Sequence, residues 1–263
     1  MTGLLRAELK KIRSTRLWWV LLIGALVLSA IQSVAVAAIA GMDPGAGAPG
    51  QVPGLEDPAA IRAVYPSAMF TGTYIFALVL GIIGMAGEYR HQTITATFLV
   101  SPRRSRVVVA KLLAHFVAGL GYALAGILVV LVAGGITMTV RGHGLGLDAD
   151  RLWPTIGLSV LAVGIWAVIG VGVGTLLRHQ IVAIVAAVLF VWIIEPLLSL
   201  VLTLVDWDHV SKWLPSNASS ALMAPGGALG ELLVWWAGGL VLLAYGLAIA
   251  GLGVLLSMRR DVS

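Results

Sequence analysis

Six long apolar stretches constrain this chain more than any other feature of its sequence. Of its 263 residues, 59% are hydrophobic and 11% are charged, and the mean hydropathy is +1.00. A helix of roughly 20 apolar residues crosses a hydrocarbon core about 30 Å thick, and in lipid a helix satisfies every backbone amide internally. We therefore predict an all-α polytopic membrane protein, with residues 1–263 forming one transmembrane domain. The predicted transmembrane helices are residues 17–40, 64–86, 112–140, 152–177, 181–205 and 232–257.

Residues 1–16 precede the first span and show a different pattern. Five Lys and Arg residues alternate there with apolar residues at helical spacing, namely Leu4, Leu5, Leu9 and Ile12. This pattern predicts an N-terminal interfacial helix. Residues 35–37 and 38–40 resemble signal-peptide cleavage sites, so a cleaved leader is the alternative. The apolar run of 24 residues exceeds the roughly 7 to 15 residues of a signal-peptide core, which favours an uncleaved span.

Charged residues are sorted by side of the membrane. With both termini in the cytoplasm, thirteen of the seventeen Lys and Arg residues lie inside, and the acidic residues lie mainly outside. The four outer basic residues are Arg62, Arg141, Arg151 and Lys212. By the positive-inside rule we expect cytoplasmic N- and C-termini in the plasma (inner) membrane. Because the basic residues are not gathered into one binding face, the net charge of +5 does not indicate a nucleic-acid partner.

The sequence lacks the usual motifs of membrane-embedded enzymes. It contains no cysteine, no Gly-x-x-x-x-Gly-Lys-Ser/Thr, no His-Glu-x-x-His and no Gly-x-Ser-x-Gly. Its five histidines are scattered over both sides of the membrane rather than clustered at the spacing of metal ligands. We therefore expect no catalytic residue, no metal and no cofactor bound by this chain, and a role in transport or association.

A polar segment, residues 87–111, separates the second and third spans. It carries five of the seventeen Lys and Arg residues, so it must lie in water or at the membrane interface. Ile94 and Phe98 stand four residues apart on one face of a predicted short amphipathic helix. Pro102 ends that helix, because proline disfavours helical geometry at the residue before it. An ordinary basic loop that obeys the positive-inside rule is the plainer interpretation.

Three motifs in this segment resemble the first cytoplasmic loop of type 2 ABC transporter permeases (ABC-2 type transmembrane subunits). They are Glu-x-Arg-x-x-Thr from Glu88, Ser101-Pro102 followed by Arg106, and Ala110-Lys111. The resemblance implies that the loop carries a coupling helix, which docks on a separate cytoplasmic ATPase. The residues that it assigns to ATPase coupling are Glu88, Arg90, Thr93, Ile94, Phe98, Pro102 and Arg106.

The layout of the whole chain is similar to the same family, including predicted short outer re-entrant helices within residues 206–231. The resemblance implies a half-transporter that pairs with a second permease subunit, identical or different, and with two ATPase copies that bind ATP and Mg. Family members export lipids, polysaccharides, drugs, antibiotics and peptides. Because the spans offer Trp166, Trp192 and aliphatic surface but almost no charge, we expect efflux of an amphipathic, drug-like or lipid-like substrate.

Two other classes of protein are alternatives. A secondary transporter driven by an ion gradient would need several membrane-buried ionisable groups near broken helices, and the spans offer one, Glu195. A toxin-immunity membrane protein would transport nothing. An ATPase gene beside the gene for this chain would favour the ABC transporter over both.

Glu195 and Pro196 form a candidate outer gate or part of the substrate path. Glu195 lies 14 residues into the fifth span. In a straight helix it would stand about 21 Å from the cytoplasmic end, in the outer half of the membrane. We expect a kink there, because Pro196 cannot bond the carbonyl of Trp192 one turn earlier. A packing hydrogen bond that fixes the fifth span against its neighbours is the alternative role for Glu195.

Overall fold

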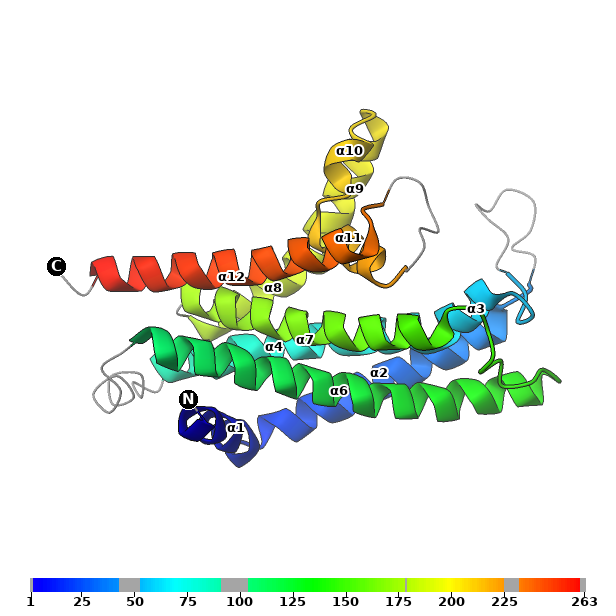
Figure 1. Ribbon diagram of the computed structural model, residues 1–263, viewed down its shortest axis with the longest axis horizontal. Helices are drawn as coiled ribbons and strands as arrows, with labels where there is room; N and C mark the ends of the chain where they lie inside the picture. The colour runs from blue at the N-terminus through cyan, green and yellow to red at the C-terminus, as the bar shows by residue number, and fades with distance from the viewer. Residues whose placement is uncertain (1, 43–52, 91–103, 178, 225–231, 261–263) are drawn as a thin grey trace.

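The computed structural model describes residues 2–42, 53–90, 104–177, 179–224 and 232–260, and every regular element within them is helical (Figure 1). These residues contain six helices that are long and apolar enough to cross a membrane. They are Leu17–Ile39, Pro58–Arg90, Arg106–Val140, Leu152–Leu176, Gln180–Leu204 and Trp235–Gly253. The predicted fold class, an all-α polytopic membrane protein, is confirmed.

The N-terminal helix α1 (Thr2–Ser14) packs against α6 (Arg104–Val140). Its four apolar residues are partly buried, whereas its basic side chains are exposed, as the amphipathic pattern predicts. Helix α2 (Leu17–Ile39) begins three residues after α1 ends. The indole nitrogen of Trp18 donates to the Arg13 carbonyl at 3.2 Å, which fixes the corner between the two helices.

The second and third spans extend beyond the residues predicted from hydropathy. The second consists of α3 (Pro58–Arg62), the π-helical η1 (Ala63–Ser67) and α4 (Ala68–Arg90). Asp57 starts it by accepting a hydrogen bond from the Ala59 amide at 2.7 Å. Hydropathy marks only the part of a helix suited to hydrocarbon, whereas helical hydrogen bonding continues through polar residues. Both ends of the predicted loop 87–111 are therefore helical, and residues 91–103 lie outside the described residues.

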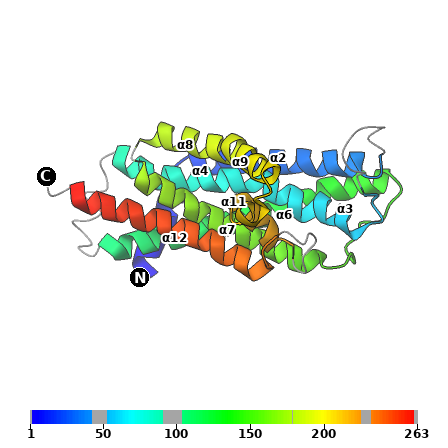
Figure 2. The ribbon, with the colours of Figure 1, turned by 90° about the horizontal axis from the view of Figure 1, so that it is seen from above.

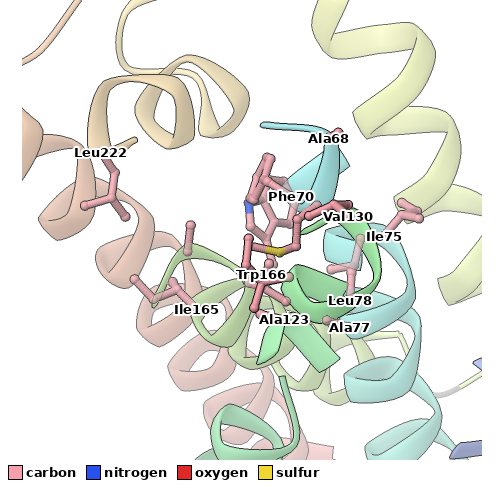
Figure 3. Close-up of a cluster of buried hydrophobic side chains, with 14 of the residues drawn as sticks. Ala68, Phe70, Ile75, Ala77, Leu78, Ala123, Val130, Ile165, Trp166 and Leu222 are labelled. Carbon is pink, nitrogen blue, oxygen red and sulfur yellow. The ribbon is translucent and has the colours of Figure 1, made fainter. Parts of the chain in front are cut away.

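Helix α7 (Leu152–Leu176) lies at the centre of the bundle and packs against α4, α6 and α12 (Trp235–Arg260) (Figures 1 and 2). It begins as predicted, with Pro154 in its first turn. Trp166 is 2% exposed and stands within a cluster that includes Phe70, Leu78 and Val130 (Figure 3). Because α4 and α7 are the most buried of the spans, they form the core around which the others pack.

Glycines set the distance between α4 and α7. A Cβ atom at Gly170 would overlap the Leu78 carbonyl, and one at Gly174 would lie 2.7 Å from the Ile82 carbonyl. This pair is the Gly-x-x-x-Gly spacing that permits close approach of two helices. Here it packs against α4 of the same chain, so it does not provide a dimer face.

The fifth span changes direction near its middle. It consists of α8 (Gln180–Leu189), the π-helical η2 (Phe190–Ile194) and α9 (Glu195–Leu204). Figure 1 shows α9 and the following α10 (Asp208–Ser211) standing out steeply from the long axis of the bundle. The interruption lies directly before Pro196, as predicted, because a wider helical turn relieves the missing amide and the clash of the proline ring. Glu195 lies at the bend itself, so the fifth span does not continue past it as one straight helix.

Two short helices, α10 and α11 (Pro215–Leu222), lie within residues 206–231, where short outer helices were predicted, and α11 packs against α12 and α7. The N-terminus and the C-terminal end of α12 lie at one end of the bundle, together with the ends of α4 and α6 that flank residues 91–103 (Figures 1 and 2). Six spans bring the two ends of a chain to the same side. That end is called the terminal end below.

Candidate functional site

Four charged side chains form a closed ring of ion pairs, the ion ring, at the terminal end of the bundle. Lys111 donates to Glu8 Oε2 at 2.6 Å and to Glu88 Oε1 at 2.9 Å. Lys11 donates to Glu8 Oε1 at 2.7 Å and to the same Glu88 oxygen at 2.8 Å. Positive and negative groups alternate around the ring, so their charges cancel. Because α1, α4 and α6 each contribute, the ion ring ties three helices together.

Burial differs strongly around the ion ring. The Lys111 side chain is 2% exposed and the Glu8 side chain 5%, whereas that of Lys11 is 47% exposed. The Lys111 ammonium also donates to the Gly84 carbonyl at 3.1 Å, so all three of its hydrogens have acceptors. A buried charge is costly unless it is paired and hydrogen-bonded. Separating the buried members Lys111 and Glu8 would leave a charge buried without its partner, so this part of the ring strongly favours the paired state.

The ion pairs shift two pKa values on α1. Burial acts to raise the pKa of the Glu8 carboxyl, but the ammonium groups of Lys111 and Lys11 outweigh it and lower the pKa below its usual value. Burial acts to lower the pKa of Lys11, but hydrogen bonds to Glu8 and Glu88 outweigh it and raise the pKa. Both shifts favour the charged forms of Glu8 and Lys11.

The ion ring includes one residue from each end of the predicted coupling loop. Glu88 lies in the last turn of α4 and takes part in the ring, and Lys111 lies on α6, the helix that follows residues 91–103. Arg90 is exposed at the end of α4, and Arg106 is exposed on α6. The remaining predicted coupling residues lie outside the described residues, namely Thr93, Ile94, Phe98 and Pro102.

Sequence reasoning missed the partners of Glu88. Glu8 stands four residues after Leu4 and four before Ile12, so it is an acid on the apolar stripe of α1. Lys111 stands in an otherwise apolar run that continues into the third span. An acid on one apolar stripe and a lysine inside another are a signal of a buried ion pair, because neither is stable there alone.

One cavity adjoins the ion ring, and a second lies beside the first. The first, the ring cavity, has a volume of about 460 Å³ and lies between α1, the start of α2, α4, α6 and the start of α8. The second has a volume of about 450 Å³ and is lined by the last turn of α4 and the first residues of α8. Arg90 and Gln180 line both, and Arg90 Nη1 lies 3.5 Å from Gln180 Oε1. This long contact is the boundary between the two cavities.

Glu195 holds the start of α11. It is 1% exposed, and its Oε1 accepts a hydrogen bond from the Ser216 amide at 2.5 Å. Leu214, at the N-cap of α11, has no side chain that can accept a hydrogen bond, so Glu195 satisfies this helix terminus from another element. Its Oε2 has no hydrogen-bond partner among the described residues. The hydrogen bond from Ser216 packs the fifth span against α11 through Glu195 Oε1. The second carboxyl oxygen, Oε2, could accept a hydrogen bond from a bound molecule.

Aromatic residues connect the region around Glu195 and α11 to the core. Tyr74 stacks on Phe70 with ring centroids 4.9 Å apart and meets Trp166 edge-on at 5.2 Å. The Trp166 indole donates to Ser219 Oγ on α11 at 3.0 Å, and the exposed Trp192 donates to the Tyr74 hydroxyl at 3.0 Å. Trp166 was expected to offer surface to a substrate, but it is buried. Of the two predicted tryptophans, Trp192 is the one at the surface.

Among the described residues, no group of three or more His, Asp or Glu side chains could hold a metal ion. The ion ring brings together ammonium and carboxylate groups that already neutralise each other. Its chemistry is that of a mechanical link between helices rather than of a reaction centre.

A family model described as ABC-2 family transporter protein matches residues 4–205. The match includes α1 from Leu4 onward, all members of the ion ring and the first five spans. The chain belongs to the ABC-2 transporter family. It is the transmembrane permease component of an ABC transporter and not itself the ATPase; permeases of this family act with an ABC ATPase. No curated protein matches the sequence.

Proposed function

We propose that the permease is half of an ATP-driven exporter, which moves an amphipathic, drug-like or lipid-like substrate out of the cell. In this proposal it lies in the plasma (inner) membrane with both termini in the cytoplasm. The observation that carries the proposal is the ion ring, which joins both ends of the predicted coupling loop to the interfacial helix α1. A loop that transmits the movement of an ATPase to the spans needs such a rigid attachment to them.

In this proposal the ATPase docks on the loop between α4 and α6. Ile94 and Phe98 supply the apolar contact, and Arg90 and Arg106 supply a basic rim. Both arginines are exposed at the terminal end, which supports their availability to a partner. ATP and Mg are bound by the ATPase, and the permease binds no cofactor. Movement of the loop would reach α1, α4 and α6 together, because the ion ring joins them.

A second permease subunit completes the transporter in this proposal, as an identical or a different chain. The fifth span has the least buried apolar window of the six, and exposed residues such as Leu197 and Leu200 lie on α9. Because the chain has no cysteine, a single Leu200→Cys variant can be crosslinked in native membranes, and Leu128→Cys probes the exposed face of α6 in the same way. If neither variant forms crosslinked dimers, the second subunit is not an identical chain that packs through one of these two faces.

Glu195 and Pro196 act in this proposal at the outer gate. The Glu195–Ser216 hydrogen bond links the fifth span to α11 at the bend before Pro196. Movement of the fifth span would therefore move α11, and movement of α11 would move the fifth span. Glu195 Oε2 is a buried polar atom without a hydrogen-bond partner among the described residues. The exposed Trp192 and the aliphatic residues around it suit a substrate with a large apolar part.

Transport in inside-out membrane vesicles tests the proposed function. Vesicles that contain the permease and its ATPase should accumulate a fluorescent amphiphile when ATP is added, because outward transport in the cell is inward in these vesicles. A catalytically inactive ATPase should abolish accumulation, whereas ionophores that collapse ion gradients should leave it unchanged. Accumulation that survives ATPase inactivation and disappears with ionophores would instead establish a secondary transporter.

A further inference from the structure

The ring cavity has walls of two kinds. Apolar side chains from α1, α2 and α4 form one side, namely Ile12, Leu17, Leu80 and Ile83. The ion ring and Arg90 form the other. The cavity is bordered by an amphipathic helix of the kind that lies at the membrane interface. A molecule with a charged head and an apolar tail has the chemistry that both walls require.

The charges that line the cavity favour an anionic head. Lys11, Arg90 and Lys111 face Glu8 and Glu88, so three cations meet two anions and one positive charge is left over. Both carboxylates are already occupied by the two lysines of the ion ring. An incoming anion therefore meets Arg90, the cation of this lining that is not a member of the ion ring, beside the half-exposed Lys11.

Among the described residues, the hydrogen-bond donors that are not fully engaged lie at the rim of the cavity. Arg90 has five N–H donors, and the contact with Gln180 at 3.5 Å engages one of them only weakly. Lys11 spends two of its three ammonium hydrogens in the ion ring and is 47% exposed. Lys111 has none to spare, since its three hydrogens are all bonded within the protein. Phosphate oxygens could therefore bind Arg90 and Lys11 without breaking the ion ring.

We propose that the ring cavity binds one anionic phospholipid of the cytoplasmic leaflet. Its phosphate contacts Arg90 and Lys11, and one acyl chain lies against Leu80 and Ile83. Because Gln180 at the start of α8 also lines the cavity, a lipid bound there adds a contact between the ion ring and the fifth span. A free phosphate offers the same anion without the acyl chain, so an experiment must separate the two.

Gly87 provides a steric test of this site. It lines the ring cavity, and a Cβ atom placed on it would meet no other atom within 4 Å. A Gly87→Phe side chain can therefore enter the cavity without a clash at its first atom. Gly121 also has open space at its Cβ position and lies on a helix, but it does not line the cavity. Gly121→Phe is therefore the matched control.

The measurement is native mass spectrometry of the full-length permease in detergent, titrated with phosphatidylglycerol, phosphatidylcholine or inorganic phosphate. We expect one phosphatidylglycerol per chain to be retained, with binding at least about fivefold stronger than that of phosphatidylcholine. Arg90→Gln should weaken phosphatidylglycerol binding by about fivefold, which corresponds to one basic contact with a lipid surface. Arg13→Gln, which removes an exposed charge of α1 outside the cavity, should leave it unchanged. Gly87→Phe should abolish binding, and Gly121→Phe should not.

Each contrary result would overturn a definite part of the proposal. Equal binding of the two lipids would refute the role of charge, and equal weakening by Arg90→Gln and Arg13→Gln would indicate general surface attraction instead of a site. Displacement of the lipid by millimolar inorganic phosphate would assign the site to free anions. Retention of the lipid by Gly87→Phe would place it outside the cavity. The thermal midpoint of each variant without lipid distinguishes loss of the site from loss of the fold.

Discussion

Replacing Lys111 by Met removes the most buried charge of the ion ring while leaving a side chain of similar length. Lys111 is 2% exposed, and its loss leaves Glu8 Oε2 and the Gly84 carbonyl without their donor. Removing one partner of a buried ion pair costs about 3 to 5 kcal/mol, and here the two carboxylates would keep only the half-exposed Lys11 as an ion-pair partner in the ring. We expect Lys111→Met to lower the apparent free energy of unfolding in detergent by that amount.

Lys11 supplies the matched control for this prediction, because it binds the same two carboxylates. Its side chain is 47% exposed, so solvent screens its ion pairs. Exposed pairs contribute about 0.2 to 1 kcal/mol, and we expect Lys11→Met to cost no more than this range. The double variant Lys111→Met with Glu8→Gln should recover part of the loss, because the stranded charge is removed as well. Equal effects of Lys111→Met and Lys11→Met, both below about 1 kcal/mol, would refute the inference that burial makes the inner ion pairs essential.

Three further predictions concern pH, helix packing and the outer region. The lowered pKa of Glu8 gives stability that is present above its unfolded pKa of about 4.3 and is lost as the pH falls through the lower folded value. The raised pKa of Lys11 gives stability that is present below its unfolded pKa of about 10.4 and is lost as the pH rises through the higher folded value. The thermal midpoint should therefore form a plateau between about pH 5 and pH 10, and Glu8→Gln should reduce the loss on the acid side. Gly170→Leu should cost at least about 3 kcal/mol in a thermal or denaturant assay because it collides with the backbone of α4, whereas Gly121→Ala should be neutral or stabilise by up to about 1 kcal/mol. Glu195→Leu leaves the first turn of α11 uncapped and should cost about 0.5 to 2 kcal/mol. Glu195→Gln keeps the acceptor and should fold normally while slowing export; export at the parental rate would leave Glu195 with the packing role alone.

Hydropathy was enough to predict the six spans, because the length and composition of an apolar helix are local properties of the sequence. The amphipathic N-terminal helix and the start of α7 near Pro154 could also be predicted, since each depends on a few adjacent residues. Helix ends were harder to predict. The continuation of α4 to Arg90 and the start of α6 at Arg104 cross residues that are too polar for hydrocarbon, and hydropathy gives no information on helices there.

The ion ring and the bend of the fifth span depend on contacts between distant residues. Glu8 and Lys111 are 103 residues apart, and a single sequence does not state which of several charged residues meet. Pro196 predicted where the fifth span would be interrupted, but not the direction that α9 takes after the interruption. The sequence placed Glu195 inside the fifth span beside Pro196, whereas its specific partner, the Ser216 amide, required the fold.

Stimulation of the partner ATPase by the reconstituted permease tests the central claim most directly. Phe98 is the apolar residue expected to enter the ATPase, so Phe98→Asp should abolish both co-purification and stimulation, while Phe98→Leu should retain them. The thermal midpoint of the permease alone should be unchanged in both variants. Normal stimulation and co-purification by Phe98→Asp would contradict the assignment of residues 87–111 as the segment that couples ATP hydrolysis to transport.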